Sequence, residues 1–163
     1  MVFEATSLPG SLATIQPATW RDLNSLRHLE RLCFPKDAWP LLDLVGVLTL
    51  PNVVRLKAEA DGLADRLAGR LMVGFIAADV RPSQHTAWIA TIGVLPEYRG
   101  RGIGRKLLEA CEAQIHEQSV RLCVRAANQT AIQLYLSSGY QRAGLWPNYY
   151  QDGEEALVME KKL

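Results

Sequence analysis

The segment GVLPEYRGRGIGRKLLEAC, residues 93–111, decides the fold of this chain. Its central seven residues, RGRGIGR at 99–105, include three glycines and three arginines. Apolar residues predict a buried strand over 88–94 before this turn and a helix over about 104–118 after it. Glycine loses more conformational entropy on ordering than any other residue, so three of them directly before a helix require a physical reason.

A glycine-rich turn between a strand and a helix is suited to a phosphate or pyrophosphate. The backbone amides of the first helical turn have no intrahelical acceptor, and the helix dipole adds a partial positive charge there. The glycine spacing differs from the dinucleotide fingerprint and no GK[ST] follows, so neither a Rossmann site nor a Walker loop fits. From the loop alone, a flexible basic loop before an ordinary helix stays open as an alternative.

The whole chain has the size and composition of one globular domain, residues 1–163, with 48% hydrophobic residues. Eighteen basic against seventeen acidic residues leave a charge of +1, which argues against nucleic acid or an anionic membrane as partner. Three cysteines without paired spacing favour reduced thiols and a cytoplasmic location. The chain shows no signal peptide and no uninterrupted run of eighteen apolar residues, and its histidines form no metal-binding motif, so no metal is expected.

Apolar periodicity predicts a mixed α/β order along the chain. The beginning, 1–12, is expected to be a flexible leader, and 61–70 a loop with possible helical character. Strands are expected over 13–16, 53–60, 71–80, 88–94, 120–124, 141–146 and 155–161. Helices are expected over 19–33, 37–50, 104–118 and 129–138.

Four segments, in order along the chain, resemble the GNAT acetyltransferases. RGRGIG at 99–104 matches the family signature R/Q-x-x-G-x-G/A. Three further segments are similar to family motifs: LCFPKDAW at 32–39, VRAANQTAIQLYLSSGY at 124–140 and PNYYQDGEEALVMEKKL at 147–163. The resemblance covers about residue 14 to the C-terminus and is strongest to the protein N-terminal acetyltransferases, the ribosomal-protein alanine type among them.

The resemblance implies an α/β GNAT fold. This fold is a single mixed, mostly antiparallel seven-stranded sheet with helices on both faces. The sheet would be splayed between its fourth strand, ending at Val94, and its fifth strand, starting near Val120. The implied reaction moves the acetyl group of the cosubstrate acetyl-CoA to a primary amine.

Carried over to this chain, the resemblance implies a donor site. The amides of Arg99–Gly104 and the neighbouring arginines would hold the pyrophosphate, the main chain of Ile92–Val94 would pair with the pantetheine arm, and Tyr135 would protonate the leaving thiolate. The residues implied to bind acetyl-CoA are Ile92, Gly93, Val94, Arg99, Gly100, Arg101, Gly102, Ile103, Gly104, Arg105, Asn128 and Tyr135. From the residues alone, Asn128 is equally a helix cap, and a tyrosine on a helix face such as Tyr135 is more often a core side chain.

The chain departs from its relatives at the general base. Where they carry Glu or His in the fifth strand, this chain has Cys123, and where some carry Tyr in the fourth strand, it has Trp88. Strand alternation places Cys123 on the face opposite Leu122 and Val124, toward the expected substrate channel. A small hydrophobe, a thiolate base and an acyl-accepting nucleophile all stay open for this thiol.

A site without a strong base favours a weakly basic acceptor. An α-amine has a pKa of about 8, whereas a lysine near 10.4 needs about 4 kcal/mol for deprotonation at neutral pH. We therefore expect a peptide or protein N-terminus, bound by Phe34, Pro35, Trp88, Tyr149 and Tyr150. A small-molecule amine acetyltransferase and a CoA-binding regulatory module without catalysis are the alternatives, and a monomer or weak homodimer is the expected assembly.

Overall fold

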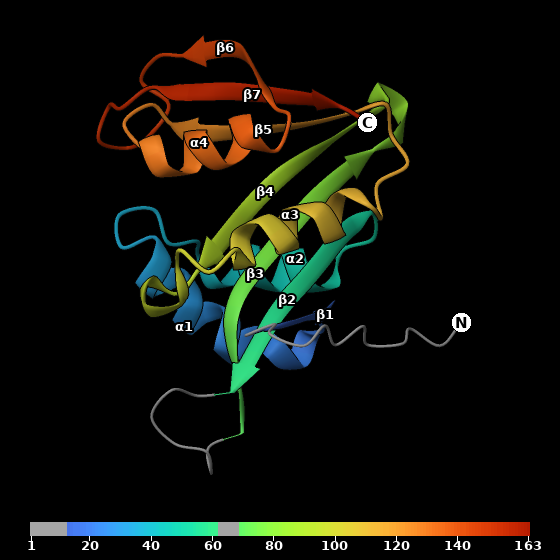
Figure 1. The fold of residues 1–163 in the computed structure, drawn as a ribbon, viewed down its shortest axis with the longest axis vertical. Helices are drawn as coiled ribbons and strands as arrows, with labels where there is room; N and C mark the ends of the chain where they lie inside the picture. Colours follow the sequence, from blue (N-terminus) through green and yellow to red (C-terminus); the bar gives the residue numbers. More distant parts are fainter. Residues whose placement is uncertain (1–12, 62–68) are drawn as a thin grey trace.

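The computed structural model describes residues 13–61 and 69–163. The expected leader over 1–12 and most of the expected loop over 61–70 lie outside the described residues. A seven-stranded sheet in the order β1-β2-β3-β4-β5-β7-β6 runs through the described chain (Figure 1). Its strands are β1 (Thr14–Pro17), β2 (Val53–Asp61), β3 (Arg70–Arg81), β4 (Thr86–Val94), β5 (Ser119–Arg125), β6 (Gln141–Trp146) and β7 (Ala156–Lys162). All neighbouring strands are antiparallel except β4 and β5, which are parallel.

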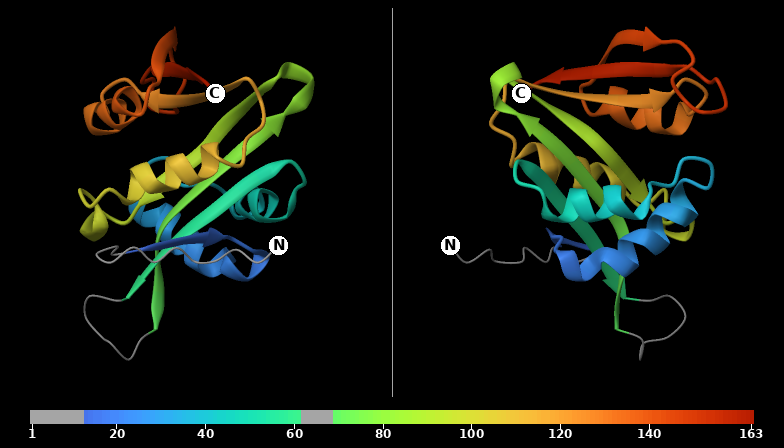
Figure 2. Two further views of the ribbon diagram at one scale, coloured as in Figure 1. Left: turned by 45° about the vertical axis from the view of Figure 1, so that its right-hand side comes forward. Right: turned by 180° about the vertical axis from the view of Figure 1, so that it is seen from behind.

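Helices cover both faces of the sheet (Figures 1 and 2). The helices α1 (Leu23–Cys33) and α2 (Leu41–Thr49) lie against one face, and α3 (Ile103–Glu112) lies against the other. The last helix, α4 (Gln129–Ser137), lies beside β5 and β7. Short 3-10 turns occur at Trp20–Asp22, Pro82–Gln84 and Pro96–Tyr98. The predicted sheet with helices on both faces is therefore confirmed, and no helix in 13–61 or 69–163 is long and apolar enough to span a membrane.

The helix after the glycine turn is shorter than its sequence predicts. It ends at Glu112 instead of near residue 118. The N–H groups of Gln114 and Ile115 each bond a carbonyl three residues back at 3.0 Å, which closes the helix with tight turns. The apolar side chain of Ile115 still packs into the core at 6% exposure. The spacing of apolar residues typical of a helix therefore extends past Glu112, although the helix does not.

Prolines set the limits of the first two helices. The helix expected within 37–50 begins at Leu41, because Pro40 is extended, with a ψ of 153°. The first helix ends at Cys33, as predicted from Pro35. The turn between α1 and α2 lies beside the opening between β4 and β5.

The sheet splits between its two parallel strands. Pairing of β4 with β5 runs only from Thr86 opposite Ser119 to Ile89 opposite Leu122. Beyond Ile89 the two strands diverge (Figure 1). The register between β3 and β4 shifts at this point and leaves Ala90 without an opposite residue. Because a bulge bends a strand and increases its twist, it turns the second half of β4 away from β5, and the predicted splay is confirmed.

Candidate active site

The turn before α3 is open and lined by main chain. Gly100 and Gly102 have φ angles of 73° and 77°, in the left-handed region that favours glycine. A Cβ atom added at either position would meet no atom within 4 Å, so the packing of the protein does not require glycine there. Gly102 directly precedes the first residue of α3. The turn therefore presents amides to open space at a helix N-terminus, which suits an anion.

The three arginines of this turn are anchored around it. Each donates a hydrogen bond to a main-chain carbonyl: Arg99 to Val94 at 2.9 Å, Arg101 to Glu97 at 3.1 Å and Arg105 to Ser137 at 3.3 Å. The Arg105 guanidinium also bonds the Ser137 hydroxyl at 2.6 Å, which joins α3 to the end of α4. These bonds keep three cationic groups beside the glycine turn. The side chain of Ile103, by contrast, is 3% exposed and belongs to the core.

A cavity opens where β4 and β5 separate. It is lined by both strands beyond their last paired residues and by the α1–α2 turn, α4 and the β6–β7 loop. The sequence-predicted residues that line it are Phe34, Ile92, Cys123, Asn128, Tyr135 and Tyr150. Pro35 is exposed and lines neither this cavity nor the one beside it. Gly93 faces α1, where an added Cβ would come within 3.2 Å of the Phe34 ring.

An adjoining cavity has an aromatic wall. Trp88 stacks on Trp146 with ring centroids 5.8 Å apart, Trp146 contacts Tyr149 at 5.6 Å, and Tyr149 contacts Tyr150 at 5.1 Å. Trp39, Cys123 and Tyr150 line both cavities, so the two spaces form one cleft. Sequence analysis missed Trp39 and Trp146, although both lie in or beside the quoted segments.

Cys123 lies at the junction of the two cavities with a neutral thiol. Burial raises the pKa of this thiol, and the nearby Tyr149 hydroxyl offsets only part of that effect. Burial likewise raises the pKa of the Tyr149 hydroxyl, and that of Tyr150 to about 12. A thiol with a raised pKa carries little thiolate at neutral pH, so the environment does not activate Cys123 as a base or nucleophile.

Tyr135 supplies a protonated hydroxyl to the same cavity. The residue is 5% exposed, and its ring packs 5.8 Å from that of Tyr140. Burial raises the pKa of the Tyr135 hydroxyl well above its ordinary value of about 10. This side chain therefore keeps its proton at neutral pH, and its ring contributes to the core.

Asn128 fills the capping role that the sequence left open. Its Oδ1 atom accepts a hydrogen bond from the Ala131 N–H at 3.1 Å, at the start of α4. The same residue lines the cavity. Capping and cavity lining are compatible here, because the cap lies at the cavity end of α4.

A buried carboxylate that no sequence pattern indicated lies next to the cavity. Glu30 in α1 is 1% exposed, and its Oε1 accepts a hydrogen bond at 2.9 Å from the hydroxyl of Thr91, which lines the cavity. Burial raises the pKa of Glu30. A charged residue at a buried helix position gives no signal that distinguishes it from a surface one, so only the packing of α1 on β4 could show this contact.

The split sheet and its cleft define a class of protein. The glycine turn is suited to a pyrophosphate, the unpaired stretch of β4 is suited to an extended arm, and Tyr135 lines the cavity between β4 and β5. This is the arrangement expected of an acetyl-CoA-dependent acetyltransferase. The chain belongs to the acetyltransferase (GNAT) family, whose profile matches residues 23–140. The predicted enzyme class and the predicted cosubstrate, acetyl-CoA, are thereby confirmed.

Similar proteins share most of the chain. N-alpha-acetyltransferase RimI of Mycobacterium tuberculosis is 34% identical over 150 residues, 91% of each protein. An N-alpha-acetyltransferase of Sulfurisphaera tokodaii is 30% identical over 165 residues, 98% of each protein. The crystal structure of the ribosomal-protein-S18-alanine N-acetyltransferase from Escherichia coli superposes with a TM-score of 0.77 at 27% identity, covering 92% of this chain and 93% of that one.

Proposed function

We propose that this enzyme transfers the acetyl group of acetyl-CoA to the α-amine of a protein or peptide N-terminus. The observation that carries the proposal is the cavity at the split of β4 and β5, which Tyr135 and Cys123 line and which Cys123 shares with the adjoining aromatic cavity. The N-alpha-acetyltransferases that resemble this chain over nine-tenths of its length support the same acceptor class.

The donor binds along β4 and the turn that follows it. Acetyl-CoA supplies an activated acetyl thioester. The amides of Arg99–Gly104 hold its pyrophosphate, with Arg99, Arg101 and Arg105 adding positive charge. The main chain of Ile92–Val94 pairs with the pantetheine arm, on the side where β4 has lost β5. Because the Val94 carbonyl accepts from Arg99, the arm has the remaining main-chain groups of β4 as partners.

Tyr135 acts as the general acid. The amine nitrogen forms a bond to the acetyl carbon, the carbon–sulfur bond breaks, and the departing thiolate takes the hydroxyl proton of Tyr135. The attacking nitrogen loses one proton to water as the amide forms, and solvent returns a proton to Tyr135, which restores the enzyme. Burial raises the pKa of the Tyr135 hydroxyl, so the side chain stays protonated until the thiolate forms. The same buried surroundings raise the pKa of the departing thiol, which makes its thiolate a stronger base toward the Tyr135 proton.

The absence of a Glu or His general base favours an acceptor amine with a low pKa. Cys123 stands where the relatives carry Glu or His, and burial keeps its thiol neutral. The acceptor ammonium must therefore release its proton to water, which costs little for an α-amine with a pKa of about 8 and about 4 kcal/mol for a lysine. Phe34, Trp88, Tyr149 and Tyr150 border the first residues of the acceptor, and Pro35 holds the turn that carries Phe34.

The proposal places the enzyme in the cytoplasm, as a monomer or weak homodimer. Its three thiols are unpaired in the described chain, in keeping with a reducing compartment. The neutral balance of charge, +1 over the chain, fits a peptide acceptor better than nucleic acid or an anionic membrane.

Acetylation of a peptide panel tests the proposal. Each peptide carries a free N-terminus and an internal lysine, and its matched control carries a blocked N-terminus and the same lysine. Thiol release from acetyl-CoA and fragmentation mass spectra are expected to show one acetyl group, on the α-amine, and none on the control. Turnover with simple polyamines but with no peptide would instead establish a small-molecule enzyme, and acetyl-CoA binding without any turnover would establish a regulatory module.

A further inference from the structure

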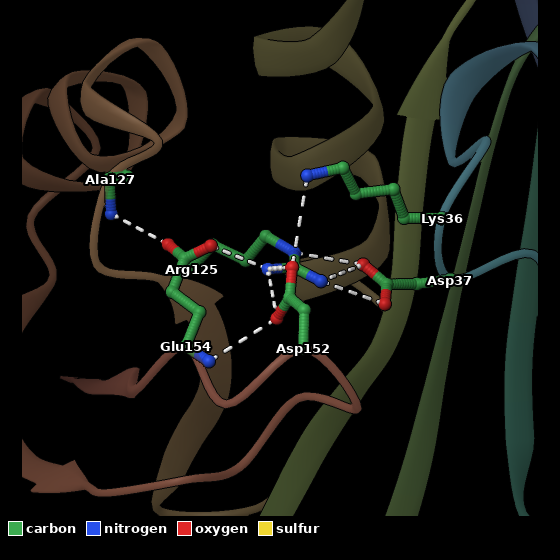
Figure 3. Close-up of polar contacts among 6 residues, drawn as sticks. All are labelled: Lys36, Asp37, Arg125, Ala127, Asp152 and Glu154. Atoms are coloured by element: carbon green, nitrogen blue, oxygen red, sulfur yellow. Dashed lines mark hydrogen bonds and ion pairs between the residues drawn. The ribbon is translucent and has the colours of Figure 1, made fainter.

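The last residue of β5, Arg125, binds three carboxylates from two separate loops (Figure 3). Its Nε donates to Asp37 Oδ2 at 2.8 Å, and its Nη2 donates to Asp37 Oδ1 at 2.8 Å. Two parallel bonds of this kind are the strongest geometry available to a guanidinium and a carboxylate. Arg125 is thus fixed to the turn between α1 and α2, 88 residues earlier in the chain.

The remaining nitrogen of the guanidinium binds the β6–β7 loop. Nη1 of Arg125 donates to both oxygens of Asp152, at 3.1 and 3.0 Å, and to Glu154. The other oxygen of Glu154 accepts from the Ala127 N–H at 3.0 Å, which ties the loop to the segment that leads into α4. Figure 3 shows the guanidinium between the two groups of acids. One side chain therefore joins three segments that are distant in sequence.

This ion network lies beside the acceptor cleft. Asp37, Arg125 and Tyr150 line the cavity at the sheet split, and the guanidinium carbon lies 4.0 Å from the centre of the Tyr150 ring. The Arg125 side chain is only 18% exposed. Fully exposed ion pairs contribute little to stability, but the Arg125–Asp37 pair is partly shielded from solvent and bidentate. Its contacts therefore hold the loops more firmly than the exposed Lys36–Asp152 pair, which spans 3.8 Å.

We propose that Arg125 is a positioning residue that clamps the α1–α2 turn and the β6–β7 loop together across the acceptor cleft. The clamp fixes Tyr150, which lies under the guanidinium, and Trp39, two residues after Asp37, as opposite walls for the acceptor. The proposal rests on the proposed function, because it assigns the cleft to the acceptor. It predicts that loss of Arg125 weakens the acceptor site and leaves the donor site intact.

The test compares Arg125→Gln with Lys57→Gln. Lys57 is a matched control, because it too bridges two carboxylates, Asp22 and Glu59, at 2.7 Å each, and its side chain is 14% exposed. Lys57 lines neither cavity. Hydrogen exchange measured on both variants follows residues 34–40 and 147–155, and steady-state kinetics give the KM for acceptor and for acetyl-CoA separately.

Arg125→Gln is expected to speed amide exchange in both loops and to raise the acceptor KM about tenfold, as for the loss of one strong charge-assisted contact. The KM for acetyl-CoA stays within about twofold of the wild-type value, and Lys57→Gln changes neither loop nor acceptor KM. Arg125→Lys keeps the positive charge but not the planar guanidinium. Its loop exchange rates and its acceptor KM are therefore expected to lie between those of the wild type and those of Arg125→Gln. Unchanged exchange in the two loops, or an unchanged acceptor KM, overturns the clamp.

Two further measurements separate the clamp from folding and from the proposed function. Asp37→Asn removes the charge and the second acceptor oxygen from the contact with one loop only, so exchange is expected to rise mainly over 34–40, and this result does not depend on whether Arg125→Gln folds. Hydrogen exchange requires no acceptor. If the wild-type enzyme acetylates no peptide, the proposed function fails, whereas the exchange results still decide whether Arg125 joins the two loops.

Discussion

The proposed donor side and the proposed acceptor side of this enzyme are built in different ways. On the donor side, the turn over 99–104 is continuous in sequence, and Arg99 and Arg101 bond carbonyls only five and four residues away. On the acceptor side, Arg125 binds carboxylates 88 and 27 residues away. The turn proposed for the pyrophosphate is a mainly local motif, with Arg105 alone of its three arginines bonded to a distant element, whereas the proposed acceptor site is assembled from loops that meet only in the folded chain.

This difference predicts how the two sides respond to substitution. A local motif tolerates changes elsewhere in the protein but not within its own backbone, because its geometry is set by its own φ angles. An assembled site responds to the loss of any contact that joins its segments. Variants of Tyr135, Gly102, Cys123 and Arg101 test the comparison, from the largest expected effect to the smallest.

Tyr135→Phe has the largest expected effect, because Tyr135 serves the step at which the two sides meet. The change keeps the buried ring and removes only the acidic hydroxyl. The expected fall in kcat is about 10² to 10⁴, the usual range for loss of a general acid, with acetyl-CoA binding unchanged by calorimetric titration.

Tyr140→Phe is the matched control for the lost hydroxyl. The Tyr140 ring packs against Tyr135, and its hydroxyl donates to Glu112 Oε1 at 2.8 Å. Its removal is expected to lower stability by about 0.5–1.5 kcal/mol and to leave kcat near the wild-type value. Equal losses of kcat in the two variants would assign Tyr135 to packing alone.

Gly102→Val tests the local nature of the donor site. A branched side chain at a φ of 77° is strained, and its methyl groups would occupy the open space assigned to the pyrophosphate. The expected result is a loss of acetyl-CoA affinity of about tenfold or more, because the amide at the helix start can no longer approach the anion. Calorimetric titration measures the affinity directly.

Gly69→Val controls for backbone strain. Gly69 has a φ of 78°, and a Cβ there would likewise meet nothing within 4 Å. It precedes β3 and lines neither cavity. This variant is expected to lose stability without losing acetyl-CoA affinity. An equal loss of affinity in both glycine variants would mean that strain, and not the local motif, explains the result.

Cys123→Ala is expected to change kcat by no more than a few-fold. Burial raises the pKa of this thiol, so it is protonated at neutral pH and takes no proton from the acceptor. Alkylation of Cys123 by iodoacetamide is expected to be slow at pH 7 and to accelerate steadily as the pH is raised into the alkaline range, since the reactive form is the thiolate.

A large loss of kcat in Cys123→Ala would contradict this assignment, above all if acetyl-CoA or acceptor protected the thiol from alkylation. Such a result would make Cys123 a base or an acyl carrier. It would also remove the argument for an α-amine acceptor, because a working base could deprotonate a lysine.

Arg101→Ala has the smallest expected effect. The side chain is exposed and reaches the Glu97 carbonyl and the face of Tyr98. Exposed charges contribute about 0.2–1 kcal/mol and are screened by salt, so acetyl-CoA affinity is expected to fall about fivefold or less. The loss should shrink further as salt is raised. A salt-independent loss as large as that of Gly102→Val would place the donor site in the side chains instead of the backbone.

Sequence patterns predicted most of the fold because they report local geometry. The strands around Phe75 and Leu122 followed from apolar runs, and the end of α1 followed from Pro35. The end of α3 was wrong by six residues, because the apolar period continued to Ile115 after the hydrogen-bond pattern had changed. Periodicity records burial, and a buried turn carries the same signal as a buried helix.

The acceptor side was predicted only in part. Tyr149 and Tyr150 were found by resemblance, but their neighbours Trp39 and Trp146 were missed, because nothing local marks an aromatic residue that borders a cleft. Pro35 was expected at the cleft, yet it lies exposed at the turn. Phe34, its neighbour in sequence, lines the cavity, whereas Pro35 does not.

By itself, the sequence indicated the family from motifs in four segments, and it predicted the order of strands and helices and a glycine turn suited to an anion, since each of these patterns lies within a short stretch of residues. Only the tertiary structure decided that Glu30 is buried against Thr91, that Asn128 caps α4 while facing the cavity, and that Arg125 joins two loops. The physical reason lies in burial and charge pairing. The pKa of Cys123 depends on which distant side chains exclude water from it, and the partners of Arg125 depend on which distant loops meet it. Both are fixed only when the strands and loops have come together in the folded chain.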